Sequence, residues 1–231
     1  MQMSTQRWIF ALLVTALLAS ASTASADELY LEVHGHLEGT DGVQQTLADR
    51  EVITGPAVLL GIEPEALSGL RLMAGLSDDT FNHGSHFNGQ LASDWQRTRV
   101  MAKADWGVDV FGDTVRPMIR MGVGYSYQRL ELATSDATYR GTDHGVSAMA
   151  AAGLESRYQL GGDEDTQGRV SLGANALVGY AWNSRADFDE METTENVEDS
   201  SWERSGYDAG SMRSAGVTFS VGVNLRYRFG R

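Results

Sequence analysis

Histidine is the side chain in this sequence best suited to metal binding or acid–base chemistry, and the chain contains five. His34 and His36 stand two positions apart, and Glu32 precedes them by the same spacing. On an extended strand, residues two and four positions apart point to one face, so these three side chains would lie together. Two histidines so placed can bind a metal ion. They can equally join a buried hydrogen-bond network, and we expect the network and no metal site.

The other three histidines lie in polar segments. Residues 82–86 carry two histidines and a serine, which could hold a metal ion or pair the serine with its base. His144 and Ser147 are three positions apart, which puts them on opposite faces of a strand. A lipid- or peptide-modifying enzyme stays an alternative, in which replacing His83, His86 or His144 would abolish an activity. We expect no catalytic residues and no cofactor.

The segment 183–212 is the most acidic part of the chain. It contains nine Asp and Glu residues against only Arg185 and Arg204. A run of like charges is typical of a solvated, self-repelling loop, and this is the reading we favour. The alternatives are capture of a divalent cation or recognition of a basic partner. The spacing of an EF-hand is missing, so any calcium site here would be weak and irregular.

Overall composition excludes several classes of function. The formal net charge is -13 and the sequence pI is about 4.7. Phosphate backbones would repel such a chain, so we expect no nucleic-acid partner. Without any cysteine, the chain has no disulfides, no thiolate metal sites and no lipid-attached amino-terminal cysteine.

The first residues have the pattern of an export signal. Arg7 is the only charged residue before Asp27, and an apolar run covers 8–18. This run has the length of a signal-peptide core and is too short to span a bilayer as a helix. Ala24 and Ala26 flank a serine in a small-residue cleavage motif. We predict a signal peptide over residues 1–26 and one mature domain over 27–231.

The segment 214–229 alternates strictly between apolar and polar residues. The apolar positions begin at Val217 and recur at every second residue up to Phe229. Period two predicts a strand with one apolar and one polar face. The segment is longer than the common soluble strand of about five or six residues.

Seven further segments show the same alternation. We predict strands from Leu29 onward and then over 54–62, 66–76, 96–106, 115–128, 145–160 and 169–182, with the strand that ends at Phe229 as the eighth. The links between them alternate long and short: 38–51, 63–65, 77–94, 107–114, 131–143, 161–168 and 183–212. Eight antiparallel strands with every long link at one end are typical of an outer-membrane barrel. The predicted fold class is therefore an all-β, eight-stranded, antiparallel up-and-down transmembrane barrel.

Aromatic residues gather at the two ends of the predicted strands, all on the apolar face. Two aromatic girdles flanking an aliphatic band suit the two bilayer interfaces. The outer girdle would contain Tyr125, Tyr127, Tyr180 and Trp182, and the inner girdle Trp106, Tyr158, Tyr227 and Phe229. A soluble periplasmic barrel is the alternative, with these aromatics in its core.

The polar faces would line a narrow lumen, because eight strands enclose little more than their own side chains. Charged groups at membrane depth must pair or meet water. We therefore predict a lumenal ion-pair network and not an open pore. Its members would be Glu32, His34, His36, Arg99, Lys103, Arg120, Glu155, Arg157 and Arg226. A narrow channel for small solutes is the alternative.

These features together resemble the small OmpA/OmpX-type outer-membrane barrels. The resemblance covers residues 27–231 and includes Pro117 followed by Gly122, Gly124 and Tyr125. It implies a place in the outer membrane of a Gram-negative bacterium, with membrane lipid and the barrel-insertion machinery as partners. It also implies a structural or surface-interaction role carried by long outer loops. Such chains typically end on an aromatic residue, whereas here Phe229 is followed by Gly230 and Arg231.

Overall fold

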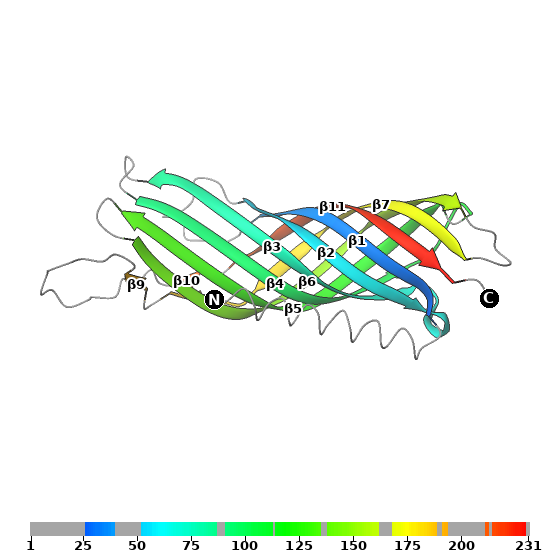
Figure 1. The fold of residues 1–231 in the computed structure, drawn as a ribbon, viewed down its shortest axis with the longest axis horizontal. Helices are drawn as coiled ribbons and strands as arrows, with labels where there is room; N and C mark the ends of the chain where they lie inside the picture. Colours follow the sequence, from blue (N-terminus) through cyan, green and yellow to red (C-terminus); the bar gives the residue numbers. More distant parts are fainter. Residues whose placement is uncertain are drawn as a thin grey trace, which may run out of the picture.

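Strands make up nearly all of the described chain. The structure, a computed structural model, describes residues 26–39, 52–86, 91–112, 114–134, 138–161, 168–188, 191–193, 211–212 and 214–229. The signal peptide predicted over residues 1–26 lies outside these ranges except for Ala26, so it stays a prediction. Figure 1 shows a long cylinder of tilted strands, with β9 at one end and the end of β11 at the other.

Eight long strands form the cylinder, and three short ones lie along the last connection. The long strands are β1 (Ala26–Gly39), β2 (Val52–Pro64), β3 (Leu70–His86), β4 (Leu91–Gly107), β5 (Val115–Thr134), β6 (Thr138–Gly161), β7 (Arg169–Asn183) and β11 (Ala215–Arg228). The short ones are β8 (Ala186–Asp187), β9 (Glu192–Thr193) and β10 (Ser211–Met212), and a 3-10 turn, η1, covers Glu65–Leu67. Among the described residues, no helix is long and apolar enough to cross a bilayer.

The long strands close into a ring. Each pairs antiparallel with its neighbours in the order β5-β4-β3-β2-β1-β11-β7-β6, and β6 pairs back with β5. The predicted all-β, eight-stranded, antiparallel up-and-down barrel is confirmed by these pairings. Closure leaves no unpaired edge, which is also the only way a sheet can satisfy its backbone inside hydrocarbon.

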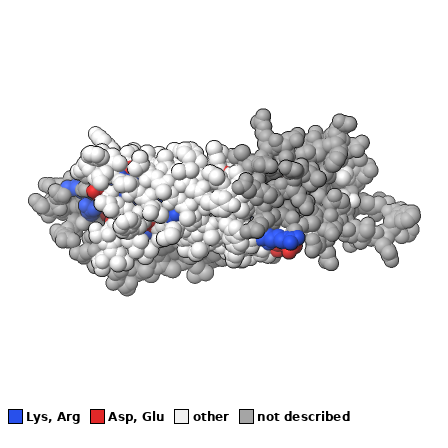
Figure 2. Space-filling view, turned by 180° about the vertical axis from the view of Figure 1, so that it is seen from behind, with Lys and Arg blue, Asp and Glu red and all other residues white. Residues whose placement is uncertain are grey.

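The barrel is apolar outside and polar inside. On β5 the exterior Val123 is 64% exposed, whereas Arg120 on the lumenal face is 1% exposed. The same alternation of exposed apolar and buried polar residues runs along β1 and β11. One side of the described surface is mostly uncharged, with the larger groups of charged atoms toward its two ends (Figure 2). This is the inverse of a soluble fold, which exposes charge and buries apolar groups.

Two predicted loops are largely strand, and this is the main correction. Residues 77–94 hold the end of β3, which continues to His86, and the start of β4 at Leu91. Residues 131–143 hold the end of β5 and the start of β6. At the other end, the strand predicted from Ala66 begins only at Leu70, because η1 and Gly69 occupy the turn.

The added strand residues form an extension of β3 to β6, and on β5 the alternation of its side chains is reversed. On β5, Arg129 and Glu131 lie on the exterior parity, whereas Leu130 and Leu132 are 1% and 2% exposed inside. Polar-out and apolar-in is the pattern of a sheet in water. The loop assignment failed because the extension lacks the apolar exterior that identified the strands below it.

Candidate functional site: a charged lumen under an apolar cap

Arg120 on β5 is the centre of the lumenal network. Its guanidinium donates to Glu32 at 2.6 and 2.8 Å and to Asp105 at 2.7 and 2.8 Å. Such paired, charge-assisted bonds fix both the position and the orientation of the side chain. Glu32 lies on β1, four strands from β5 in either direction around the ring. The Glu32–Arg120 pair therefore crosses the full width of the lumen.

Glu32 is held from several directions. Asn175 on β7 donates to it at 2.8 Å, Tyr30 donates its hydroxyl, and His34 Nδ1 lies 2.9 Å from its Oε1. The Tyr30 ring is fully buried, and the Arg71 guanidinium carbon lies 4.0 Å from its centre. A cation over an aromatic face adds attraction in a desolvated site. Tyr30 thus joins the network with both its hydroxyl and its ring.

Further ion pairs continue toward the end of the barrel opposite the extension, which we call the inner end. Glu155 on β6 accepts from Arg71 at 3.3 Å and from Arg226, and it lies 3.2 Å from Arg157. At the inner rim Arg116 binds Glu63 at 3.0 Å and the carbonyl of Gly69 at 2.6 Å. We call these groups the inner cluster: Glu28, Glu32, Glu63, Arg71, Asp105, Asp109, Arg116, Arg120, Glu155, Arg157, Arg226 and Arg228.

A second, separate set of charges, the outer cluster, lies nearer the extension. Its members are Glu38, Asp79, Arg97 and Arg99. Arg97 is fully buried and donates to Glu38 at 2.8 Å and to Asp79 at 2.7 Å. Arg99 lies 3.0 Å from Asp79 and 3.2 Å from Glu38. His36 Nε2 lies 2.8 Å from Asp79, so this histidine belongs to the same network.

An apolar cap covers the lumen beyond the outer cluster. It consists of Ile53, Trp95, Leu130, Leu132, Tyr139, Ala186, Phe188 and Met191. These residues come from the extension, from β2 and from the start of the β7–β11 connection. The short strand β9 pairs with β6 at Tyr139 and Arg140, and so holds that connection against the extension. The lumen thus contains charged clusters, with an apolar cap beyond them.

The network is balanced charge for charge. Eight carboxylates in the two clusters each make an ion pair, and eight guanidinium groups provide the partners. Paired charges avoid the desolvation penalty of an isolated buried ion.

All nine residues predicted to line the lumen face inward. Eight of them take part in the clusters or contact them: Glu32, His34, His36, Arg99, Arg120, Glu155, Arg157 and Arg226. The ninth, Lys103, is buried but forms no ion pair with another described residue. The prediction missed Tyr30, Glu38, Arg71, Asp79, Arg97, Asp105 and Arg116, which are also buried and bonded. Strand parity alone identifies Tyr30, Arg71, Arg97 and Asp105, which alternate with apolar exterior positions.

The histidines do not assemble a metal or catalytic site in the described part of the chain. No group of three or more His, Asp or Glu side chains there could hold a metal ion. His144 lies on the exterior face of β6, with Nδ1 2.5 Å from the Tyr125 hydroxyl. The side chains of His83 and His86 lie outside the described residues.

The residues predicted as aromatic girdles lie on the exterior face. Six are well exposed, from 39% for Tyr227 to 72% for Tyr158, and Tyr127 and Trp182 are half-buried. Tyr227 and Phe229 pack edge to face with ring centres 5.1 Å apart. Their place at a membrane interface remains a prediction.

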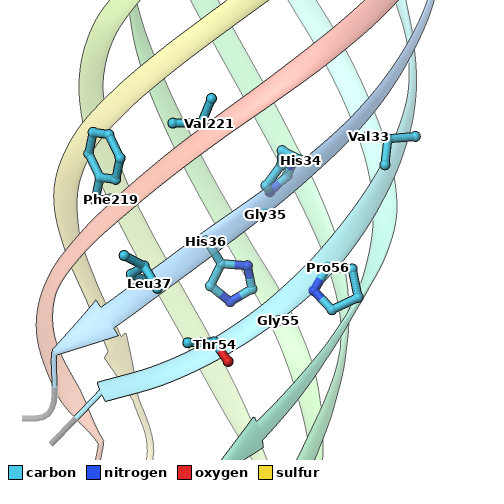
Figure 3. Close-up of a pocket in the computed structure, with 10 residues that line it drawn as sticks. All are labelled: Val33, His34, Gly35, His36, Leu37, Thr54, Gly55, Pro56, Phe219 and Val221. Carbon is cyan, nitrogen blue, oxygen red and sulfur yellow. The ribbon is translucent and has the colours of Figure 1, made fainter.

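A shallow groove of about 590 Å³ interrupts the exterior face over β1, β2 and β11. Gly35 lies at its floor, since a Cβ built there would meet nothing within 4 Å. Figure 3 shows Val33, Leu37 and Pro56 around this glycine, with Phe219 and Val221 on the neighbouring strand.

The extension carries a small exposed ion cluster. Glu131 accepts from Arg129 at 2.7 Å and from Arg140 at 2.9 Å. Hydrogen bonds from these two guanidinium groups, that of Arg129 first, hold the pKa of Glu131 below its usual value. Most of the acidic segment 183–212 lies outside the described residues, so its proposed cation or basic partner stays untested.

Comparisons with known proteins give similarity at the level of fold only. No family model matches the chain, and no curated protein matches it. Among solved structures it is similar to Neisserial surface protein A, with 12% identity, 87% and 97% of the two chains covered, and a TM-score of 0.43. It is also similar to the attachment invasion locus protein Ail of Yersinia pestis (8% identity, 88% and 99% covered, TM-score 0.44). A third is a major outer membrane protein from Thermus thermophilus (11% identity, 87% and 99% covered, TM-score 0.46). These matches agree with the expected resemblance to small outer-membrane barrels, while the fold itself rests on the strand pairing.

Proposed function

We propose that this protein is an outer-membrane β-barrel with a closed lumen and a structural or surface-interaction role. The lipid-facing band would be the apolar exterior of the eight strands. The working part would be the extension of β3 to β6 together with the β7–β11 connection that packs on it. We propose no catalytic activity and no nucleic-acid partner.

The observation that carries the proposal is a sharp change of exterior polarity across four neighbouring strands. One row of paired residues is apolar: Leu76, Val100, Tyr125 and Val146. The next row outward is Asp78, Thr98, Tyr127 and His144, and the row beyond is Thr80, Gln96, Arg129 and Thr142. An exterior that turns from aliphatic through aromatic to polar within two rows matches the edge of a bilayer. A soluble barrel has no reason to change its exterior at one level.

The filled lumen supports a structural role over transport. Ion pairs join strands on opposite walls, and the apolar cap lies above them. A conducting pore needs a continuous wetted path, and two charged clusters and an apolar cap lie across the described lumen. The alternative is a narrow channel for small solutes. It would require the ion pairs of the two clusters to separate in the membrane.

The exterior groove at Gly35 fits the same proposal. In a membrane, lipid acyl chains would fill this groove and cover its apolar walls. In water the same walls would be exposed to solvent, which is unfavourable. The barrel-insertion machinery is proposed as a partner during biogenesis, and a divalent cation or basic partner as a possible ligand of segment 183–212.

Two measurements test the proposal. Outer-membrane vesicles from cells producing the protein are washed with carbonate, and the barrel is expected to stay with the membrane. Release into the wash would contradict the membrane assignment. Purified, refolded barrel, shown to be folded by heat-modifiable migration on a gel, is then placed in a planar bilayer. We expect no channel current. Steady unitary current steps would contradict the closed lumen and favour the channel.

A further inference from the structure

Lys103 stands apart from every other basic residue in the barrel. Of the 18 lysines and arginines in the chain it is the only lysine. It lies on the lumenal face of β4, between Met73 on β3 and Gly122 on β5, and is 7% exposed. A Cβ on Gly122 would lie 3.0 Å from Cγ of Lys103, so this glycine leaves room for the lysine stem.

The ion pairs of the lumen do not include Lys103. Each of the eight carboxylates in the two clusters is matched by guanidinium groups, and the eight guanidinium groups use all of the carboxylates. Lys103 makes no hydrogen bond or ion pair with another described residue. An isolated buried ammonium is costly, so it requires either a counter-ion or the loss of its proton.

A small cavity lies beside Lys103. Its volume is about 20 Å³, enough for one water-sized particle. Residues of both clusters line it, with three cations, Arg99, Lys103 and Arg120, against one carboxylate, Glu38. Glu38 is already bound by Arg97 at 2.8 Å and by Arg99 at 3.2 Å. Arg99 is likewise bound to Asp79 at 3.0 Å, and Arg120 to Glu32 at 2.6 Å and Asp105 at 2.7 Å, so the positive charge left over at the wall is that of Lys103.

Three hydroxyl residues also line the cavity, and one of them, Ser77, accepts a hydrogen bond from Arg99. Thr218 and Ser220 on β11 are buried beside the cavity, and neither hydroxyl bonds to another described residue. Each hydroxyl can donate one hydrogen bond, and a lysine ammonium can donate three. The cavity thus brings an unpaired cation and free donors to one small volume.

We propose that this cavity binds a small monovalent anion of the halide class, held by the Lys103 ammonium with Thr218 and Ser220 as donors. As long as Lys103 keeps its proton, a water molecule would accept its hydrogen bonds but would leave its charge without a counter-ion. Carboxylate or phosphate ligands are larger than the cavity. The site is independent of the proposed surface role, because it depends only on the closed lumen.

The direct test is a crystal of the refolded barrel soaked in bromide and measured at the bromine absorption edge. An anomalous peak is expected within contact distance of Lys103 Nζ. A full-occupancy water with no anomalous signal would overturn the proposal. The variant Lys103→Met keeps the length of the side chain and removes the charge, so it is expected to lose the peak. Retention of the peak in this variant would also overturn it.

Unfolding in solution gives a second readout. With bromide replacing a bulky anion such as gluconate at constant ionic strength, the unfolding midpoint of the wild type should rise with bromide concentration, as for any ligand that binds only the folded state. The midpoint of Lys103→Met should not respond. Arg157→Gln, which removes a lumenal cation that does not line the cavity, should keep the response. If Lys103→Met does not fold, Thr218→Val with Ser220→Ala serves instead, and an unchanged bromide response in that pair would contradict the site.

Discussion

Arg120 shows how a single side chain can hold opposite walls of the barrel together. Its two carboxylate partners lie on β1 and β4, so it fixes the spacing between three strands. The network need not make the barrel more stable than an apolar core would, since buried ion pairs often contribute little net energy. Removing one partner is different, because the remaining charges lose their compensation while still buried.

The variant Arg120→Met should therefore be strongly destabilised. It leaves Glu32 and Asp105 facing each other without their shared cation, and loss of one partner from a buried pair costs about 3–5 kcal/mol. The measurement is the free energy of unfolding by denaturant in lipid vesicles. Arg129→Met is the matched control, because Arg129 pairs with Glu131 on the exposed extension, where a pair contributes about 0–1 kcal/mol. Equal losses in the two variants would refute the bracing role of Arg120.

Lys103 also offers a chemical test of the closed lumen. Since it is the only lysine, an amine-directed reagent can react only there and at the amino terminus. We expect a water-soluble amine reagent to modify Lys103 in the unfolded chain and to leave it unmodified in the folded barrel. Mass spectrometry of the peptide containing Lys103 measures the two rates. Equal rates in the two states would mean that the lumen admits solutes, which favours the channel.

At the scale of elements, the sequence predicts the membrane-depth strands well and their outward continuation poorly. Alternation identified β11 because its exterior residues are apolar and its lumenal residues polar. The extension around Trp95 and Leu130 has the opposite pattern, and the Asp and Asn content of residues 77–94 is typical of loops. Asp79 was missed because it lies in the predicted loop 77–94, and Glu38 because the first predicted loop began at residue 38, although Glu38 keeps the lumenal parity of β1. Ion partners such as Glu32 and Arg120 could not be paired beforehand, since strand stagger decides which residues meet across the lumen.

The extension should be removable without loss of the ring. Gln128 and Asp143 are paired across β5 and β6, so residues 129–142 can be replaced by Asn-Gly, a two-residue hairpin turn. The ring pairings below Gln128 remain, and we expect heat-modifiable migration to persist. Phe188, now 2% exposed, loses Leu130, Leu132 and Tyr139 as packing partners. Chymotrypsin should then cleave after Phe188 much faster than in the full chain.

Chymotrypsin cleavage after Phe111 provides the control for this deletion. Phe111 is 85% exposed in the turn between β4 and β5, at the opposite end of the barrel from the deletion, so its cleavage rate should change little. A deletion variant that cannot form a heat-modifiable barrel would show that the extension is part of the folding unit. Unchanged protection of Phe188 would show that the cap does not depend on β5 and β6.

The whole molecule has the polarity of a protein that spans a lipid bilayer. Among the described residues the exposed surface of the strands is mostly apolar, and the charged side chains lie inside the barrel or toward its two ends. In water such a surface would drive association, since exposed apolar patches of this extent mark sites that bind something. In a bilayer the same surface is the favourable one, and the charged interior is the part that must be closed off. Both properties are explained together only by a membrane location.

A charged substitution on this surface can show whether the apolar band faces lipid or water. Met121 is 59% exposed at the middle of the apolar band of β5, and Leu160 is 55% exposed at the inner end of β6. If the band faces lipid, Met121→Arg should cost about 2–4 kcal/mol and Leu160→Arg about 0–1 kcal/mol, because the penalty for a cation depends on depth. The measurement is guanidinium unfolding of barrels inserted in lipid vesicles. If the band faced water, both substitutions would stay within about 0.5 kcal/mol, as surface changes usually do. Because both side chains are more than half exposed, neither substitution removes much packing, and the depth-dependent difference would report the surrounding medium.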